Sequence, residues 1–167
     1  MPKVKITTID SFYDRWIWAV SLLQSPVLLA MRLYWGWQFF LAGKGKLENP
    51  DHFIGYLTSM DFPMPKVQAY VAACTECFGG LLLLAGLGSR LATVPLIFTM
   101  CVAYMTAHRP AVDTIRTNPD LFLQQAPFLF LLCSVIVLVF GPGVFSLDYV
   151  IAKLRGRTTR TVTVQQT

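Results

Sequence analysis

Charged side chains are scarce in this chain. Only 14% of its 167 residues are Asp, Glu, Lys or Arg, whereas 54% are hydrophobic; an ordinary soluble domain has about 25% charged residues. So few charges cannot cover the surface of a water-soluble globule, and 167 residues leave no room for a second domain. The fourteen Lys and Arg residues give a net charge of +5, but they lie between apolar runs rather than in one patch. This pattern indicates membrane topology and argues against nucleic acid as a partner.

The sequence also lacks the usual signatures of metal, phosphate and disulfide sites. Its two histidines, His52 and His108, are far apart in the chain, and no Cys/His spacing forms a metal-ligand set. We therefore expect no metal and no covalently bound cofactor. The four cysteines lie inside apolar runs, where a structural disulfide is unusual. They are Cys74, Cys77, Cys101 and Cys133.

Four hydrophobic stretches are long enough to cross lipid as helices, which takes about 20 residues each. They run from about Pro26 to Ala42, Val67 to Leu87, Leu91 to Ala107 and Leu121 to Phe140. The connection Gly88-Ser89-Arg90 is so short that the second and third helices must be antiparallel neighbours. We predict an all-α fold, a membrane-spanning four-helix bundle.

The two ends of the chain differ from the bundle in composition. We expect no removable signal peptide at residues 1–10, because no apolar core precedes a small-residue cleavage site. Apolar and aromatic residues at helical spacing between Ser11 and Gln24 predict an N-terminal interfacial helix, and Pro26 suits the first turn of the next helix. One long, kinked first span is the alternative. The predicted segments are 1–25 with the interfacial helix, 26–147 as the transmembrane domain, and 148–167 as a basic tail without a fold of its own.

The distribution of basic residues predicts the orientation in the membrane. With four spans, both termini and the Arg90 turn share one side. That side carries eight basic residues: Lys3, Lys5, Arg15, Arg90, Lys153, Arg155, Arg157 and Arg160. The other side carries five: Lys44, Lys46, Lys66, Arg109 and Arg116. The excess predicts a multi-pass protein with both termini in the cytoplasm.

Arg32 and Glu76 lie deep inside predicted spans, where an unpaired charge costs about 2.5–3.5 kcal/mol on insertion scales. Counted from Gly43 and Lys66, where the two spans meet the same surface, both lie about 15–16 Å deep. We therefore predict a buried ion pair. Small residues on each helix support close packing of the two stripes. The stripes are Arg32, Gly36, Phe39 and Gly43 on the first helix, and Ala69, Ala73, Glu76 and Gly80 on the second. The pair would be the floor of a ligand pocket, a proton relay or a structural clasp.

A second polar set lies near the non-cytoplasmic ends of three predicted helices. Its members are Gln38, Lys44, Tyr104, His108, Gln124 and Gln125. With Trp35, Phe39 and Phe128 as walls, this set would form a mouth that holds a flat ring with carbonyl groups. The alternative is that these side chains only anchor the helices at the lipid surface.

Cys74 and Cys77 form a C-x-x-C sequence on one helical face, which is a candidate for thiol redox chemistry with a quinone. The reactive form is the thiolate, and burial beside a carboxylate disfavours that form. Small buried apolar residues are therefore the competing interpretation.

Two motifs resemble the DoxX family. The first is Arg32-x3-Gly36-x2-Phe39-x3-Gly43-x2-Lys46-Leu47, and the second is Glu76-x2-Gly79-Gly80-Leu-Leu-Leu-Leu-Ala-Gly86-Leu87-x-x-Arg90-Leu91-Ala92. The resemblance covers about Leu29 to His108. It implies a four-helix protein of the prokaryotic inner membrane, in a family that includes a small subunit of a thiosulfate:quinone oxidoreductase.

The resemblance does not decide whether the chain is an enzyme by itself. The leading hypothesis is a membrane subunit of a quinone-linked redox complex, with a quinone headgroup above Arg32 and Glu76. The alternative is a non-catalytic accessory or assembly subunit that packs against larger membrane proteins. A small-solute transporter is less favoured, because no inverted repeat is evident.

Overall fold

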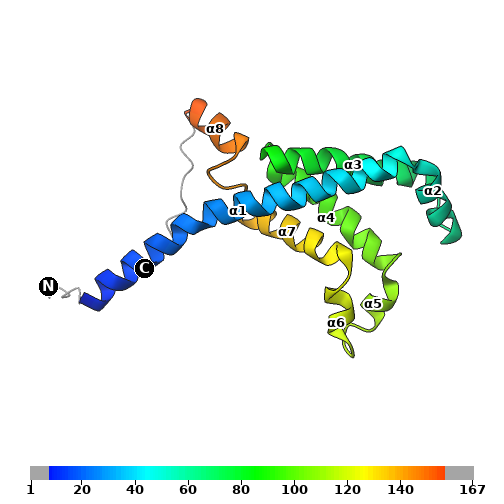
Figure 1. The fold of residues 1–167 in the computed structure, drawn as a ribbon, viewed down its shortest axis with the longest axis horizontal. Helices are drawn as coiled ribbons and strands as arrows, with labels where there is room; N and C mark the ends of the chain where they lie inside the picture. The colour runs from blue at the N-terminus through cyan, green and yellow to red at the C-terminus, as the bar shows by residue number, and fades with distance from the viewer. Residues whose placement is uncertain (1–7, 157–167) are drawn as a thin grey trace.

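The computed structural model describes residues 8–156, which are mostly helical (Figure 1). Within this range it contains eight helices and no strand, which confirms the all-α prediction. The helices are α1 (Thr8–Glu48), α2 (Pro50–Ser59), α3 (Pro65–Ala85), α4 (Ser89–Met105), α5 (Arg109–Asp113), α6 (Pro119–Leu123), α7 (Ala126–Phe140) and α8 (Leu147–Leu154).

Helices α1 and α3 lie side by side and antiparallel (Figure 1). Glycines set their separation. A Cβ atom at Gly43 would lie 2.7 Å from the carbonyl oxygen of Ala73, and one at Gly80 would lie 2.6 Å from the backbone nitrogen of Phe40. Only glycine therefore permits this backbone approach, which is how small residues join helices in lipid. Both predicted stripes are buried, as expected.

The core lies where α4 and α7 pack beside this pair. Leu96 and Met100 of α4 and Cys133 and Val137 of α7 are buried with Phe39 and Leu83. The connection between α3 and α4 is short, and the two helices are in contact, as predicted. The four predicted spans thus correspond to α1, α3, α4 and the α6–α7 region.

Length and hydropathy distinguish these helices. Within residues 8–156, α3 is the one helix that is both long and apolar enough to cross a membrane. Helices α4 and α7 are apolar but have only 17 and 15 residues.

The predicted boundary at Pro26 is wrong. Helix α1 continues through Pro26 for 41 residues, so residues 8–25 do not form a separate interfacial helix. Proline removes one helical hydrogen bond, and here it does not end the helix. At 1.5 Å per residue α1 is about 61 Å long, and its N-terminal half extends beyond the other helices (Figure 1).

Two further boundaries differ from the prediction. The fourth span is interrupted, because Gln125 has an extended backbone between α6 and α7 and Pro127 follows in the first turn of α7. Residues 148–167 were expected to lack a fold, but α8 covers the first part of this segment. The hydroxyl of Ser146 accepts a hydrogen bond from the backbone N–H of Tyr149 at 3.2 Å, which caps the helix.

Candidate functional site

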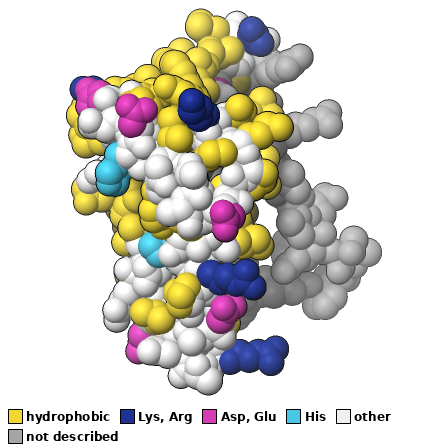
Figure 2. Space-filling model, turned by 90° about the vertical axis from the view of Figure 1, so that its right-hand side faces the viewer, with side chains coloured by type: hydrophobic (Ala, Val, Ile, Leu, Met, Phe, Trp, Pro, Cys, Tyr) yellow, Lys and Arg dark blue, Asp and Glu magenta, His cyan; other side chains and the backbone are white. Residues whose placement is uncertain are grey.

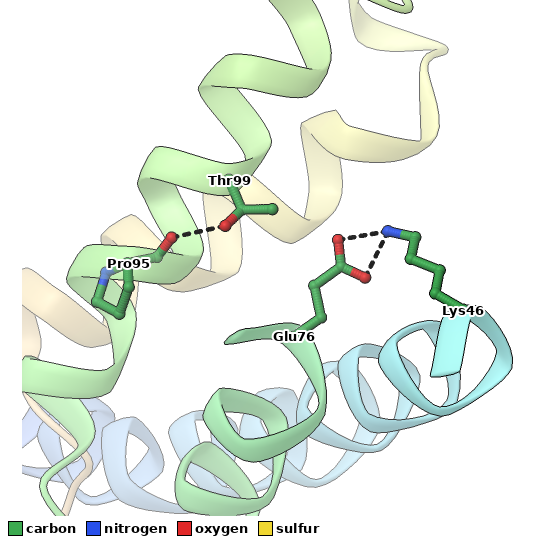
Figure 3. A network of polar contacts seen from close by, with 4 residues as sticks. All are labelled: Lys46, Glu76, Pro95 and Thr99. Carbon is green, nitrogen blue, oxygen red and sulfur yellow. Dashed lines mark hydrogen bonds and ion pairs between the residues drawn. The ribbon is translucent and has the colours of Figure 1, made fainter. Parts of the chain in front are cut away.

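Glu76 and Lys46 form an ion pair inside the helical bundle (Figure 3). The ammonium group of Lys46 lies 2.6 Å from each carboxylate oxygen of Glu76. Glu76 is only 2% exposed, whereas the Lys46 side chain is 29% exposed. The Glu76 carboxylate is therefore enclosed by protein. The Lys46 ammonium group reaches it from the side of the pair that is more exposed to solvent.

The length of α1 brings Lys46 to this carboxylate. The first span was predicted to end near Ala42. Helix α1 instead continues to Glu48, so Lys46 lies in its last turn. Gly43, one turn earlier, touches the backbone of Ala73 and Cys77. This close contact between α1 and α3 keeps the backbone at Lys46 near enough to Glu76 for the flexible lysine side chain to reach the carboxylate. Phe53 of α2 covers the ammonium group, with 4.9 Å from nitrogen to ring centroid, which stabilises the cation further.

The ion pair lines a cavity of about 340 Å³ between α1, α2, α3, α4 and α7. Thr99 of α4 and Gln68 of α3 add polar groups to the wall. The remaining lining is largely apolar and aromatic: Phe39, Phe53, Tyr56, Phe62, Met100 and Phe130 are among its members. The volume falls in the lower part of the range of about 300–1,000 Å³ that is typical of small-molecule sites.

The predicted ion pair between Arg32 and Glu76 is not formed. Arg32 donates hydrogen bonds to the carbonyl oxygens of Pro142 at 2.5 Å and Phe145 at 2.8 Å, and Glu76 is bound by Lys46 instead. The prediction counted the depths of Arg32 and Glu76 from expected helix ends at Gly43 and Lys66, but α1 continues to Glu48. In the observed register Arg32 lies beside Gly86, ten residues and therefore about 15 Å along α3 from Glu76.

Arg32 closes the opposite end of the bundle. It is 1% exposed, and a Cβ atom at Gly86 would lie 2.6 Å from its guanidinium. Gly86 also has φ +69°, so both its conformation and its neighbour require glycine. Arg32 thereby holds the loop after α7 against α1, in a structural rather than a cavity-lining position.

The predicted polar mouth is dispersed, and of its members only His108 lines the cavity. Gln38 is half-buried and Gln124 is exposed. Lys44 is exposed and lies 3.5 Å from Glu48. The hydroxyl of Tyr104 donates to the carbonyl of Phe122 at 2.9 Å, which ties α4 to α6. Figure 2 views this end of the molecule, where charged side chains of both signs lie among hydrophobic ones.

Cys74 and Cys77 lie on α3 and are free thiols. Cys77 is buried, and its backbone packs against Gly43. Cys74 is partly exposed. Neither residue lines the cavity. Their position thus suits close helix packing.

Four residues of the cavity wall were not among the predicted site residues: Lys46, Gln68, Phe53 and Thr99. For Lys46 the signal was present, because matching Gly36 with Gly80 and Gly43 with Ala73 places Lys46 opposite residue 70, about 9 Å along α3 from Glu76, which two long side chains can span. The other three depend on how α2 and α4 fold over the cavity, which spacing does not specify.

The fold and the cavity define a small helical protein that encloses an ion pair within a largely apolar bundle. Residues 27–109 match the family model DoxX, so the chain belongs to the DoxX family, whose members are membrane proteins. The matched residues include Arg32, Lys46, Glu76 and His108.

Two curated relatives align over most of the chain. An uncharacterized protein of Haemophilus influenzae is 25% identical over 131 residues, which cover 76% of this chain and 84% of the relative. A Bacillus subtilis protein named "Putative oxidoreductase CatD" is 28% identical over 120 residues, which cover 72% of this chain and 83% of the relative. No solved structure matches the chain.

Proposed function

We propose that this protein is a multi-pass subunit of a quinone-linked redox complex in the prokaryotic inner membrane, and that its cavity binds a quinone headgroup. The observation that carries the proposal is the Lys46–Glu76 ion pair in the wall of a largely aromatic cavity. The oxidoreductase name of the Bacillus subtilis relative gives independent support for redox chemistry.

The donors and acceptors in the wall suit both redox forms of a quinone. A quinone carbonyl accepts hydrogen bonds, and the Lys46 ammonium has three N–H donors, of which two point to Glu76. A hydroquinone hydroxyl donates, and the Glu76 carboxylate has further acceptor positions. The rings of Phe53 and Phe130 offer flat apolar surface for the ring of the ligand.

The role of this chain is binding and proton exchange rather than electron supply. Reduction of a quinone to a hydroquinone takes two electrons and two protons. In the proposal the electrons come from a redox subunit of the complex. Lys46 and Glu76 orient the ring. Both protons come from water: Glu76 takes up one and passes it to the ligand oxygen beside it, and the other oxygen of the ligand takes the second.

Substitution of Lys46 tests the proposal. The protein is purified in gentle detergent, its lipids are extracted, and quinone per protein is measured by mass spectrometry. We expect the unmodified protein to retain quinone and Lys46→Met to retain about tenfold less, because one charge-assisted hydrogen bond contributes roughly 1.4 kcal/mol.

Lys44→Met is the matched control. It removes a lysine from the same helix, but this side chain is exposed and does not line the cavity. Retention should stay at the level of the unmodified protein. The proposal is wrong if the unmodified protein holds no quinone and does not bind added quinone.

The exposed N-terminal half of α1 favours a second candidate, an accessory subunit without a ligand of its own. Trp16, Val20, Leu22 and Leu23 are all at least 47% exposed on a part of α1 that extends beyond the bundle (Figure 1). A larger membrane protein packed there would cover them. Deletion of residues 1–23 should then abolish co-migration with a larger complex on native gels. Migration of the full chain as a free small oligomer would exclude this candidate.

A further inference from the structure

Helix α8 presents an apolar stripe that is largely exposed in the part of the chain that the structure describes. Leu147, Val150, Ile151 and Leu154 follow the i, i+3, i+4, i+7 spacing of one helical face. Leu147, Val150 and Leu154 are 47%, 48% and 82% exposed. Lys153 and Arg155 are exposed outside the stripe. Such a short helix with an apolar face and basic neighbours is typical of helices that lie in a lipid surface.

Hydrogen bonds fix the direction in which this stripe points. The backbone N–H of Asp148 donates to the Gly86 carbonyl at 2.9 Å. The Asp148 carboxylate accepts from the backbone N–H groups of Gly88 at 2.7 Å and Ser89 at 3.1 Å. The Asp148 side of α8 is thus bound to the α3–α4 turn. The stripe cannot rotate into the bundle unless these bonds break.

Helix α8 lies at one end of the bundle, level with the termini of the apolar helices. Helix α3 ends at Ala85, α4 begins at Ser89 and α7 ends at Phe140, and α8 lies at this end (Figure 1). If these helices cross the membrane, this end lies at the boundary between acyl chains and headgroups. A stripe that faces outward at this level contacts lipid.

The charge around α8 is basic. Asp148 is its acidic residue, and two helix N-terminal N–H groups already bind that carboxylate. Arg90, Lys153 and Arg155 are exposed on this side of the bundle. Basic residues beside a membrane helix attract anionic lipid headgroups, with roughly 1 kcal/mol for each residue near the surface.

We infer that α8 is a membrane-surface helix, with its Leu147–Leu154 stripe among the acyl chains and Lys153 and Arg155 on the headgroups of anionic phospholipids. This inference rests on the membrane placement of the bundle and does not depend on quinone binding. Its test uses no cavity residue, so the two proposals fail independently.

Cysteine accessibility tests the inference in bilayers. Full-length Leu154→Cys and Lys153→Cys variants are placed singly in lipid nanodiscs, whose two faces are both open to solvent. A charged maleimide that does not enter lipid is added, and labelling of the unmodified chain gives the background from the four native cysteines. We expect Lys153→Cys to react at least about tenfold faster than Leu154→Cys, because only the second thiol is covered by acyl chains.

The lipid composition tests the charge requirement. Labelling of Leu154→Cys should be slower in discs that contain phosphatidylglycerol than in discs of phosphatidylcholine alone. Adding Arg155→Gln should reduce this difference. Equal rates at positions 153 and 154 would overturn the inference, and so would protection of Leu154→Cys only in discs that hold two copies of the chain. Equal protection in both lipids would overturn the role of the anionic headgroups.

Discussion

Lys46 and Glu76 compensate each other's charge, so their effects on stability should not be additive. Removing one member of a fully buried pair costs about 3–5 kcal/mol, because the other charge is left without a partner. Lys46 is partly exposed, so we expect a smaller loss for Lys46→Met. The double variant Lys46→Met/Glu76→Gln should be more stable than Lys46→Met alone, since it leaves no charge in the cavity wall.

Thermal unfolding in detergent measures this coupling. The unmodified protein, Lys46→Met, Glu76→Gln and the double variant are compared by their unfolding midpoints. Lys44→Met is the exposed control. If the midpoint shift of the double variant equals the sum of the two single shifts, the two charges do not interact in the protein. In that case the wall of the cavity would differ from the one described here.

At this scale the sequence identified the two buried charged groups but neither of their partners. Arg32 and Glu76 were predicted to be buried, and they are 1% and 2% exposed. The residues that bind them were missed, because the first span was predicted to end near Ala42, before Lys46, and the carbonyls of Pro142 and Phe145 lie more than 100 residues from Arg32 in the chain. Residue spacing along the sequence predicts which face of a helix a side chain occupies. Its partner on the neighbouring helix depends on the register between the two helices.

The register of α1 against α3 is set by glycines, which makes it testable by opposite substitutions. At Gly80 an added Cβ would lie 2.6 Å from the backbone nitrogen of Phe40, so Gly80→Ala must push the helices apart. At Gly45, on the exposed side of α1, an added Cβ has no neighbour within 4 Å. Gly45→Ala should therefore raise stability by up to about 1 kcal/mol through helix propensity.

Thermal midpoints of the two variants should shift in opposite directions. Gly80→Ala should lower the midpoint and also weaken ligand retention, because the cavity wall moves with α3. If Gly80→Ala unfolds at the same temperature as the unmodified protein, the close contact between α1 and α3 is not the one that the structure describes.

Helices were predictable as elements because their apolar runs are long, and their ends were not. Proline at position 26 was interpreted as the start of a helix, but α1 runs through it. The two glutamines at 124 and 125 were placed inside a helix, whereas the chain bends there and the next helix begins at Ala126, with Pro127 in its first turn. A proline can stand in the first turn of a helix, as Pro127 does, or be tolerated inside one, as Pro26 is, and the sequence pattern does not distinguish the two cases.

For the whole molecule, the proposed four-span arrangement would place both termini on one side of the membrane and α2 on the other. The basic residues favour the cytoplasm for the termini, by eight to five. Gly55→Cys on α2 and Lys153→Cys on α8 report on the two sides, since both positions are exposed and a Cβ at Gly55 meets no neighbour.

In spheroplasts, a maleimide that does not cross membranes should label Gly55→Cys at once and Lys153→Cys only after the membrane is permeabilised. The physical reason is that translocating the more basic side across the inner membrane is disfavoured. The unmodified chain again gives the background of the native cysteines. Labelling of both positions before permeabilisation would mean that an even number of helices cross the membrane between α2 and α8, instead of the three (α3, α4 and α7) that four spans require. The opposite order would keep four spans but invert them, and the cavity beside α2 would then open toward the cytoplasm.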